Sequence, residues 1–254
     1  MTRVALWVAY EGTNFSGYQT QPNGRTIQDE MEKALSRIHK GAKLRIHSSG
    51  RTDTSVHARG QVVHFDTTLT IPAERWPKAL NACLPADIRI MEASIVADDF
   101  HSRYHAVKKE YRYRVLLRPD GDVFRRNVTH LVSYELSIAK MKKAAEALIG
   151  TYDFSSFCAA NTSVVDKVRT LYEVSIDYDR DELIFTLVGS GFLYNMVRII
   201  VGTLLEIGAG KRDVEELANI LAAKDRTIAG KTAPGSGLFL WKVSYESEIF
   251  SDSY

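Results

Sequence analysis

Cysteine is scarce in this sequence of 254 residues, and the scarcity excludes two kinds of fold. Cys83 and Cys158 are the only cysteines, and they stand far apart without the spacing of metal ligands. A disulfide framework or a structural zinc site needs more cysteines at closer intervals. We therefore expect no disulfide framework and no metal site, and we expect both cysteines to be free, buried thiols.

Long apolar runs are missing as well. No stretch approaches the roughly 20 apolar residues that a helix needs to span a bilayer, and the sequence does not open on a basic and then apolar leader. These absences predict a soluble, cytoplasmic protein with no membrane partner. The hydrophobic content of 45% still suffices for one large or two small packed domains.

The sequence also lacks an excess of charge of one sign. Lys and Arg number 33 against 31 Asp and Glu, and a formal net charge of +2 points to no partner by itself. The segment 101–126 is an exception, because its basic residues outnumber its acids and alternate with aromatic residues. This mixture is typical of surfaces that bind nucleic acid, although a solvated charged face is the other interpretation. The residues are Arg103, Lys108, Lys109, Arg112, Arg114, Arg118, Arg125 and Arg126, with Tyr104, Tyr111, Tyr113 and Phe124 between them.

Hydrophobic periodicity predicts the order β-α-β-β-α-β in the first part of the chain. Thr26 and Asp29 form a capping pair before an amphipathic helix, and Pro72 suits the start of a second helix. Residues of the first strand alternate with both faces apolar, as in a central strand. The predicted strands cover 3–10, 44–48, 61–67 and 88–95.

The second part predicts the same order again. Ser137 is expected to cap a helix that ends before Gly150, and a second, apolar helix runs over 193–207. A short extra helix should begin at Asp213 and Glu216. The predicted strands cover 110–117, 171–178, 183–188 and 238–245.

Two such units in tandem predict an α+β fold of two ferredoxin-like halves. We expect an N-terminal half over residues 1–105 and a C-terminal half over 106–254. Because no low-complexity linker separates them, we expect their antiparallel sheets to join, with the active-site cleft between the halves.

The stretch Gly50–His57 gathers a carboxylate, a guanidinium, hydroxyl groups and an imidazole into eight residues. It lies between two predicted strands, and functional side chains favour loops on such rigid supports. The spacing is also ordinary turn chemistry, in which Asp53 would cap its own backbone. The residues alone leave both interpretations open.

Gly50-Arg51-Thr52-Asp53, followed by Val56-His57 and Gly60-Gln61-Val62, resembles the catalytic motif of the TruA-type tRNA pseudouridine synthases. The similarity extends from Val8 to about Tyr245, nearly the whole chain. It implies that Asp53 is the catalytic nucleophile and that Arg51 fills the stack left by an extruded uridine. Three roles stay open for Asp53: attack on the uracil ring, attack on the anomeric carbon of the sugar, or induction of an elimination that gives a glycal.

The resemblance also implies a reaction, a partner and an assembly. Uridines at positions 38 to 40 of the tRNA anticodon stem-loop would be isomerised to pseudouridine by a homodimer. The rearrangement is redox-neutral, so we expect no cofactor and no metal. Gly-Ser-Gly at Gly189 and Gly235 lacks the Lys of a phosphate-binding loop, so we expect no bound nucleotide either.

Arg198 is singled out by its neighbours, which are aliphatic residues or Met on a helix that should be buried nearly all round. A buried Arg needs an anionic partner, and no acid stands three or four residues away. We take Asp53 as the candidate partner, and the resemblance implies the same pairing. Alternatives are a side chain that reaches the surface or a pair with Glu206. Asn195 stands where some relatives have His, which leaves its role open.

Other site residues are implied by the resemblance. Tyr111 would stack on the target base and take part in proton transfer, although a core tyrosine is the ordinary interpretation. Leu238 would pack on the other side of the base, or is simply a core leucine at a strand start. From the basic segment, Lys108, Lys109, Arg125 and Arg126 are predicted to bind tRNA phosphates.

Two residues depart from the motif of the family. Ser55 replaces the usual Gly, which would matter if the turn needs a positive φ angle, and Arg59 adds a charge. His57 and His64 could suggest a metal, but no third ligand accompanies them.

Two rival functions remain on the sequence alone. A non-catalytic module that binds structured RNA would use the basic segment without Asp53. A small-molecule glycosidase would need a second carboxylate aimed at the leaving oxygen, and none pairs with Asp53 in the sequence.

Overall fold

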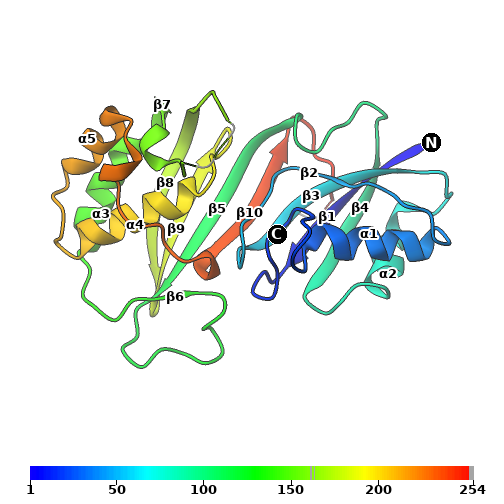
Figure 1. Cartoon of the computed structure of the whole chain (residues 1–254), viewed down its shortest axis with the longest axis horizontal. Coiled ribbons are helices and arrows are strands. Elements are labelled where there is room, and N and C mark those ends of the chain that lie inside the picture. Colours follow the sequence, from blue (N-terminus) through cyan, green and yellow to red (C-terminus); the bar gives the residue numbers. More distant parts are fainter. Residues whose placement is uncertain (161, 163, 252–254) are drawn as a thin grey trace. The chain divides into compact units, whose positions relative to one another are not determined.

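The computed structural model describes residues 1–160, 162 and 164–251 (Figure 1). The chain divides into two compact units, Met1–Val107 together with the segment from Phe239 onward, and Lys108–Leu238. The described part is a mixed α/β structure with five α-helices and mostly antiparallel strands. None of its helices is both long and apolar enough to cross a membrane. The tandem ferredoxin-like layout and the boundary at residue 105 stay predictions.

The first unit is a sheet in the order β4-β1-β3-β10 with two helices. β1 pairs antiparallel with β3 and β4, whereas β10 runs parallel to β3 with Phe239 opposite His57. The elements are β1 (Thr2–Tyr10), α1 (Ile27–Ile38), β2 (His47–Ser48), β3 (His57–Thr67), α2 (Trp76–Asn81), β4 (Ile88–Val96) and β10 (Leu238–Tyr245).

One face of this sheet forms the core with the helices. Leu6 and Val8 of β1 are fully buried, and Trp76 of α2 packs edge-on against Phe65 of β3 with ring centroids 5.2 Å apart. α1 begins as predicted, because Thr26 Oγ1 accepts a hydrogen bond from the Asp29 backbone N–H at 3.2 Å. The other face of the sheet carries Trp7, whose ring contacts Phe250 near the end of the described chain.

The second unit is an antiparallel sheet in the order β5-β9-β8-β7 with three helices. In Figure 1 the helices α3, α4 and α5 lie together beside β7 and β8. Ser137 caps α3 as predicted, and its backbone N–H donates to Gly208 O at the end of α4. The elements are β5 (Ala106–Leu116), β6 (His130–Leu131), α3 (Ile138–Ala145), β7 (Gly150–Asp153), β8 (Val168–Asp179), β9 (Glu182–Gly189), α4 (Met196–Gly208) and α5 (Glu216–Ala223).

Several predicted boundaries are wrong, and long-range pairing explains the most important one. β3 begins at His57 rather than Gln61, because its first residues pair with Tyr10 of β1 and Phe239 of β10. β2 is shorter than predicted, and β6 and β7 were missed. α4 begins at Met196 rather than 193, because Asn195 adopts a left-handed backbone with φ 61°. α5 likewise begins later, at Glu216.

The cysteines are free thiols, as expected, but only one is buried. Cys158 lies in the core of the second unit, where burial raises the pKa of its thiol. Cys83 is half-exposed after α2, so the prediction that both would be buried is wrong. Its short helix ends at Asn81 and leaves the following turn near solvent.

Candidate active site

The loop that carries Asp53 connects β2 to β3 and is fixed at its start by Gln61. Gln61 is fully buried; its Nε2 donates to Gly50 O at 2.8 Å and its Oε1 accepts from Ser49 Oγ at 2.6 Å. The backbone N–H of Ser49 donates to Val62 O. A side chain on the rigid strand β3 therefore sets where the loop leaves the sheet.

The middle of the loop is held from β1 and from the segment 11–18. The hydroxyls of Thr52 and Tyr10 lie 2.8 Å apart, and Thr52 O accepts from the Tyr18 backbone N–H at 3.0 Å. Burial raises the pKa of Tyr10 to about 12, so its hydroxyl stays protonated at neutral pH. Asp53, the next residue, is only half-buried. The loop thus holds the backbone of Asp53 still while its side chain has access to solvent, which is the preorganisation that a nucleophile needs.

Glycines let the segment 11–18 approach this loop. A Cβ on Gly12 would overlap the carbonyl oxygen of Val56. Gly17 has φ +94°, and a Cβ there would lie 2.9 Å from Thr52 O. Gly12 and Gly17 are therefore required for the packing of the segment 11–18 against the Asp53 loop.

Ser55, which replaces the usual Gly of the family motif, adopts a backbone conformation that favours glycine. Its φ angle is 61°, in the left-handed region. A residue with a Cβ is disfavoured there by roughly 1–2 kcal/mol. The loop conformation is retained in spite of this cost, held by the bonds of Thr52 and Gln61.

His57 has a structural environment rather than that of a metal ligand. The ring is buried, its Nδ1 accepts from the Gly12 backbone N–H at 2.9 Å, and it stacks on Phe239 at 4.6 Å. In the described part of the chain, no group of three His, Cys, Asp or Glu side chains could hold a metal ion. Arg51 is exposed on the same loop as Asp53, which leaves its guanidinium accessible to a nucleic acid.

Arg198 lies in the second unit, on α4, and is half-buried rather than fully buried. Its Nε donates to Ala233 O at 2.7 Å and its Nη1 to Asn195 Oδ1 at 2.8 Å. Every other residue of α4 except Glu206 is buried, as the apolar pattern predicted. The structure gives Asn195 a role that the sequence left open, since it both starts the helix and orients the guanidinium.

The alternative partner Glu206 is engaged elsewhere. Its Oε2 accepts from Arg212 Nε at 2.6 Å and its Oε1 from the Lys231 backbone N–H at 3.0 Å. The segment 230–233 therefore crosses α4. Lys231 bonds to Glu206 at one end of the crossing, and Ala233 bonds to Arg198 at the other, where the Ala233 N–H donates to Arg198 O.

Gly202 is expected to be indispensable to this crossing. In an exposed helix, Gly→Ala gains roughly 1 kcal/mol, but a Cβ on Gly202 would overlap Lys231 O. We expect Gly202→Ala to reduce the free energy of unfolding by about 1–3 kcal/mol through this clash. Urea denaturation measures the change. Gly191→Ala is the control, because its Cβ would only make ordinary contact with Arg169; equal stability of the two variants would contradict the close approach.

The two tyrosines of β5 differ in their surroundings. Tyr113 is fully buried and its hydroxyl donates to Pro234 O at 2.9 Å. Burial raises its pKa, and the nearby charge of Arg198 opposes the rise. Tyr111 keeps 8% exposure and packs edge-on against Phe192 at 4.9 Å. Both rings are buried and the contacts of Tyr113 are those of a core residue; the assignment of Tyr111 to the site stays a prediction. Leu238, at the start of β10, is buried.

The four predicted phosphate ligands do not share one environment. Lys108 and Arg126 are exposed, and Lys109 is half-buried. Arg125 donates to Asp122, Asp181 and Glu182 at 2.6 to 2.8 Å, and these bonds raise the pKa of its guanidinium. Three carboxylates thus surround Arg125, so its contacts favour a role in fixing the loop 117–129 over one in binding phosphate.

Sequence reasoning missed the side chains that position Asp53. The sequence predicted only that Tyr10 ends a strand, that Thr52 belongs to the motif and that Gln61 begins a strand. Gln61 already stood in the motif that carried the resemblance, and a buried glutamine within a strand is the signal that could have identified it.

His64 forms a cluster with two other imidazoles in the first unit. Its ring lies 5.0 Å from that of His47 and 4.7 Å from that of His101. Nδ1 accepts from the Ser102 backbone N–H at 3.2 Å, and Ser102 Oγ–H donates to His47 O. Burial first, and then the charges of His101, His47 and Arg3, lower the pKa of His64 to about 4, while Asp66 opposes them.

We expect this imidazole to make stability fall in mild acid. The unfolded chain binds a proton on His64 near its ordinary pKa of about 6.5, whereas the folded chain does not until about pH 4. The contribution is therefore complete above pH 6.5 and is lost between these values, by about 1 kcal/mol near pH 5.5. Urea unfolding across this range measures it. His64→Asn, which keeps an acceptor but does not titrate, should flatten the dependence; an unchanged curve would contradict it.

The comparisons with known proteins agree with the motif. A family model described as tRNA pseudouridine synthase matches residues 6–105 and 144–246, and the chain belongs to this family. It is accordingly an isomerase that acts on uridine in tRNA, and the resemblance read from the sequence is confirmed.

Particular relatives are similar over nearly their whole length. The tRNA pseudouridine synthase A of Halalkalibacterium halodurans is 63% identical over 238 residues, which cover 94% of this chain and 90% of that protein. The enzyme of the same name from Anoxybacillus flavithermus is 58% identical over 97% of this chain and 100% of its own length. That of Bacillus subtilis is 55% identical over 96% of this chain and all of its own.

Proposed function

We propose that this isomerase uses Asp53 as its nucleophile on uridines of the anticodon stem-loop, at tRNA positions 38 to 40. The reaction breaks the bond between uracil N1 and the sugar C1′, forms a bond from C5 to the same C1′, and moves a proton from C5 to N1. The observation that carries the proposal is the Asp53 loop, whose neighbours Thr52 and Gly50 are bonded to Tyr10 and Gln61 while Asp53 itself stays half-exposed.

Extrusion of the target nucleotide supports the role of Arg51. A stacked uridine hides both its C5 edge and its C1′, so it has to leave the helix before reaction. Arg51 is exposed beside Asp53, and its planar guanidinium is suited to take the place of a base. Tyr111, Arg198 and Leu238 keep the roles that the resemblance implies. A homodimer, a cytoplasmic location and a reaction without cofactor belong to the same proposal.

One experiment separates this proposal from the RNA-binding module. Unmodified tRNA is incubated with the protein, and pseudouridine is mapped by chemical labelling. New pseudouridine at positions 38 to 40 supports the proposal. Pseudouridine elsewhere would contradict the target, and tight binding without any conversion would favour the module.

The salt dependence of tRNA binding should identify the residues that contact phosphate. Each neutralised phosphate adds roughly 0.7–0.9 to the slope of log affinity against log salt. Replacing Lys108, Lys109 and Arg126 with Gln should therefore lower the slope by about 2 to 3. The control replaces three exposed lysines of α3, Lys140, Lys142 and Lys143, and removes the same charge. Filter binding at several salt concentrations gives the slopes; equal slopes in both variants would show that tRNA lies elsewhere.

A further inference from the structure

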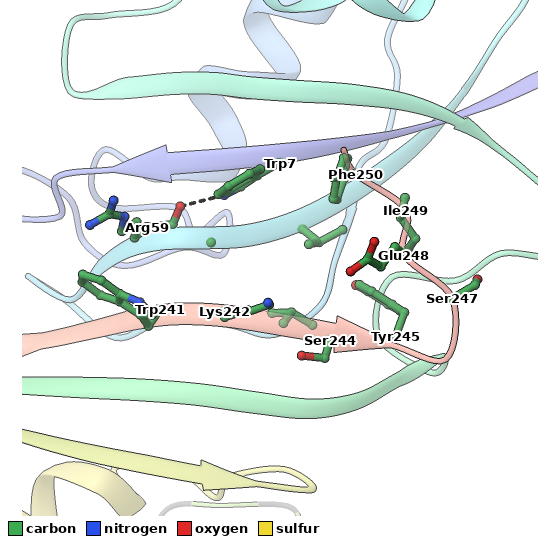
Figure 2. A pocket seen from close by; sticks show the side chains of 13 residues that line it. Trp7, Arg59, Trp241, Lys242, Ser244, Tyr245, Ser247, Glu248, Ile249 and Phe250 are labelled. Carbon is green, nitrogen blue, oxygen red and sulfur yellow. Dashed lines mark hydrogen bonds between the residues drawn. The ribbon is translucent and has the colours of Figure 1, made fainter. Parts of the chain in front are cut away.

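A pocket of about 200 Å³ lies in the first unit, on the open face of its sheet (Figure 2). Gly60 and Val62 of β3 line it together with β10 and the segment 247–250 that follows. Figure 2 shows Trp7 on β1 and Trp241 on β10 to either side of β3. Pockets for drug-sized ligands measure roughly 300–1,000 Å³, so this pocket suits a smaller group.

Aromatic surfaces at the pocket are held in place by hydrogen bonds and ring contacts. Trp7 Nε1 donates to Arg59 O at 2.7 Å, and its ring lies 6.2 Å from that of Phe250. The guanidinium of Arg59 lies over the ring of Trp241, 4.6 Å from its centroid. A Cβ on Gly60 would overlap Trp241 O, so β3 and β10 approach each other closely beneath these rings.

The rim of the pocket carries charge and hydrogen-bonding groups. Arg59, Ser247 and Glu248 are exposed, and Figure 2 shows the carboxylate of Glu248 directed toward the pocket. Indole and guanidinium planes are the groups on which unpaired bases stack, and a cation beside them attracts phosphate. A carboxylate accepts hydrogen bonds from the amino groups of adenine, cytosine or guanine, but uracil has no amino group.

We infer that this pocket binds one unpaired nucleobase of the tRNA, away from the uridine that is isomerised. The base would stack on the indole of Trp7, which Figure 2 shows between Arg59 and Glu248, with its amino group toward Glu248 and its phosphate toward Arg59. An aliphatic side chain would fill the space, but it would form no hydrogen bond or ion pair with Arg59 or Glu248. The inference rests on the proposed function only in taking tRNA as the source of the base.

Tryptophan fluorescence tests the inference in the full-length protein. The chain has three tryptophans, of which Trp7 and Trp241 line the pocket while Trp76 is fully buried against Phe65. Added 5′-AMP should therefore quench the emission of the first two only, and 5′-UMP should quench it less at equal concentration. Arg59→Gln should weaken the effect of 5′-AMP about fivefold. Arg75→Gln, which changes another exposed arginine of the same unit, should leave it unchanged.

Glu248→Met provides a second variant with little risk to folding, because this side chain is exposed, and Met has no oxygen that could accept a hydrogen bond from an amino group. It should remove the preference for 5′-AMP over 5′-UMP. Absence of quenching by either nucleotide, or equal quenching in Arg59→Gln and Arg75→Gln, would overturn the inference. A change in the oligomeric mass of Arg59→Gln while nucleotide binding stays intact would also overturn the inference. That result would show that the pocket binds a second copy of the chain. Pseudouridine mapped in the same wild-type preparation reports on the proposed function independently of all these outcomes.

Discussion

Asp53→Asn is expected to abolish pseudouridine formation while leaving tRNA affinity within about tenfold of the wild-type value. Amide and carboxylate have nearly the same shape, but only the carboxylate is a competent nucleophile. The loop should accept the change, because Thr52, Gly50 and Gln61 hold it through hydrogen bonds of their own. Single-turnover conversion and filter binding on the same preparation measure the two quantities.

The matched control is Asp99→Asn, which removes one exposed carboxylate from the same unit. It changes the net charge equally and should keep full activity. Full single-turnover activity in Asp53→Asn would end the proposed mechanism. Loss of both activity and folding would instead show that Asp53 supports the loop, and thermal unfolding distinguishes that case.

Arg198→Met is the second change with a large expected effect, on activity and on stability together. Its apolar neighbours alone would predict that Met is tolerated at no cost. The structure alters this expectation, because Ala233 O and Asn195 Oδ1 both accept from the guanidinium. Ala233 is buried, and leaving its oxygen without a donor costs about 1–3 kcal/mol. Activity should fall at least about a hundredfold, since the proposed function pairs Arg198 with Asp53 and an opposing charge favours the ionised form of a carboxyl group.

Arg212→Met separates the two effects of this change. Arg212 lies in the same unit and also bonds acceptors on helices, namely Glu206 and Glu216. Its loss should lower the thermal midpoint without lowering the conversion rate at a temperature where the protein stays folded. If Arg198→Met behaves in the same way, Arg198 serves the fold and has no part in the reaction.

Features with a local cause could be predicted from the sequence. The alternation of Val4, Leu6 and Val8 gave β1, and the capping pair Thr26 and Asp29 gave the start of α1. The apolar neighbours of Arg198 gave the buried helix α4. The family also followed from a short motif, because Gly50 to Gln61 keeps its chemistry within one contiguous stretch. Periodicity, caps and motifs act over a few residues, so they can be read without knowing what lies beside them.

The tertiary structure decided the features that depend on residues distant in the sequence. Pairing with Tyr10 and Phe239 moved the start of β3 back to His57, and packing against Val56 explains why Gly12 is a glycine. Three carboxylates, two of them far along the chain, surround Arg125, which the sequence presented only as one cation of a basic segment. The sequence by itself thus determined the family and suggested Asp53 as the candidate nucleophile. Which side chains hold the loop of Asp53, and which charged groups stay accessible, was decided only by non-local contacts, which satisfied some polar groups and left others at the surface.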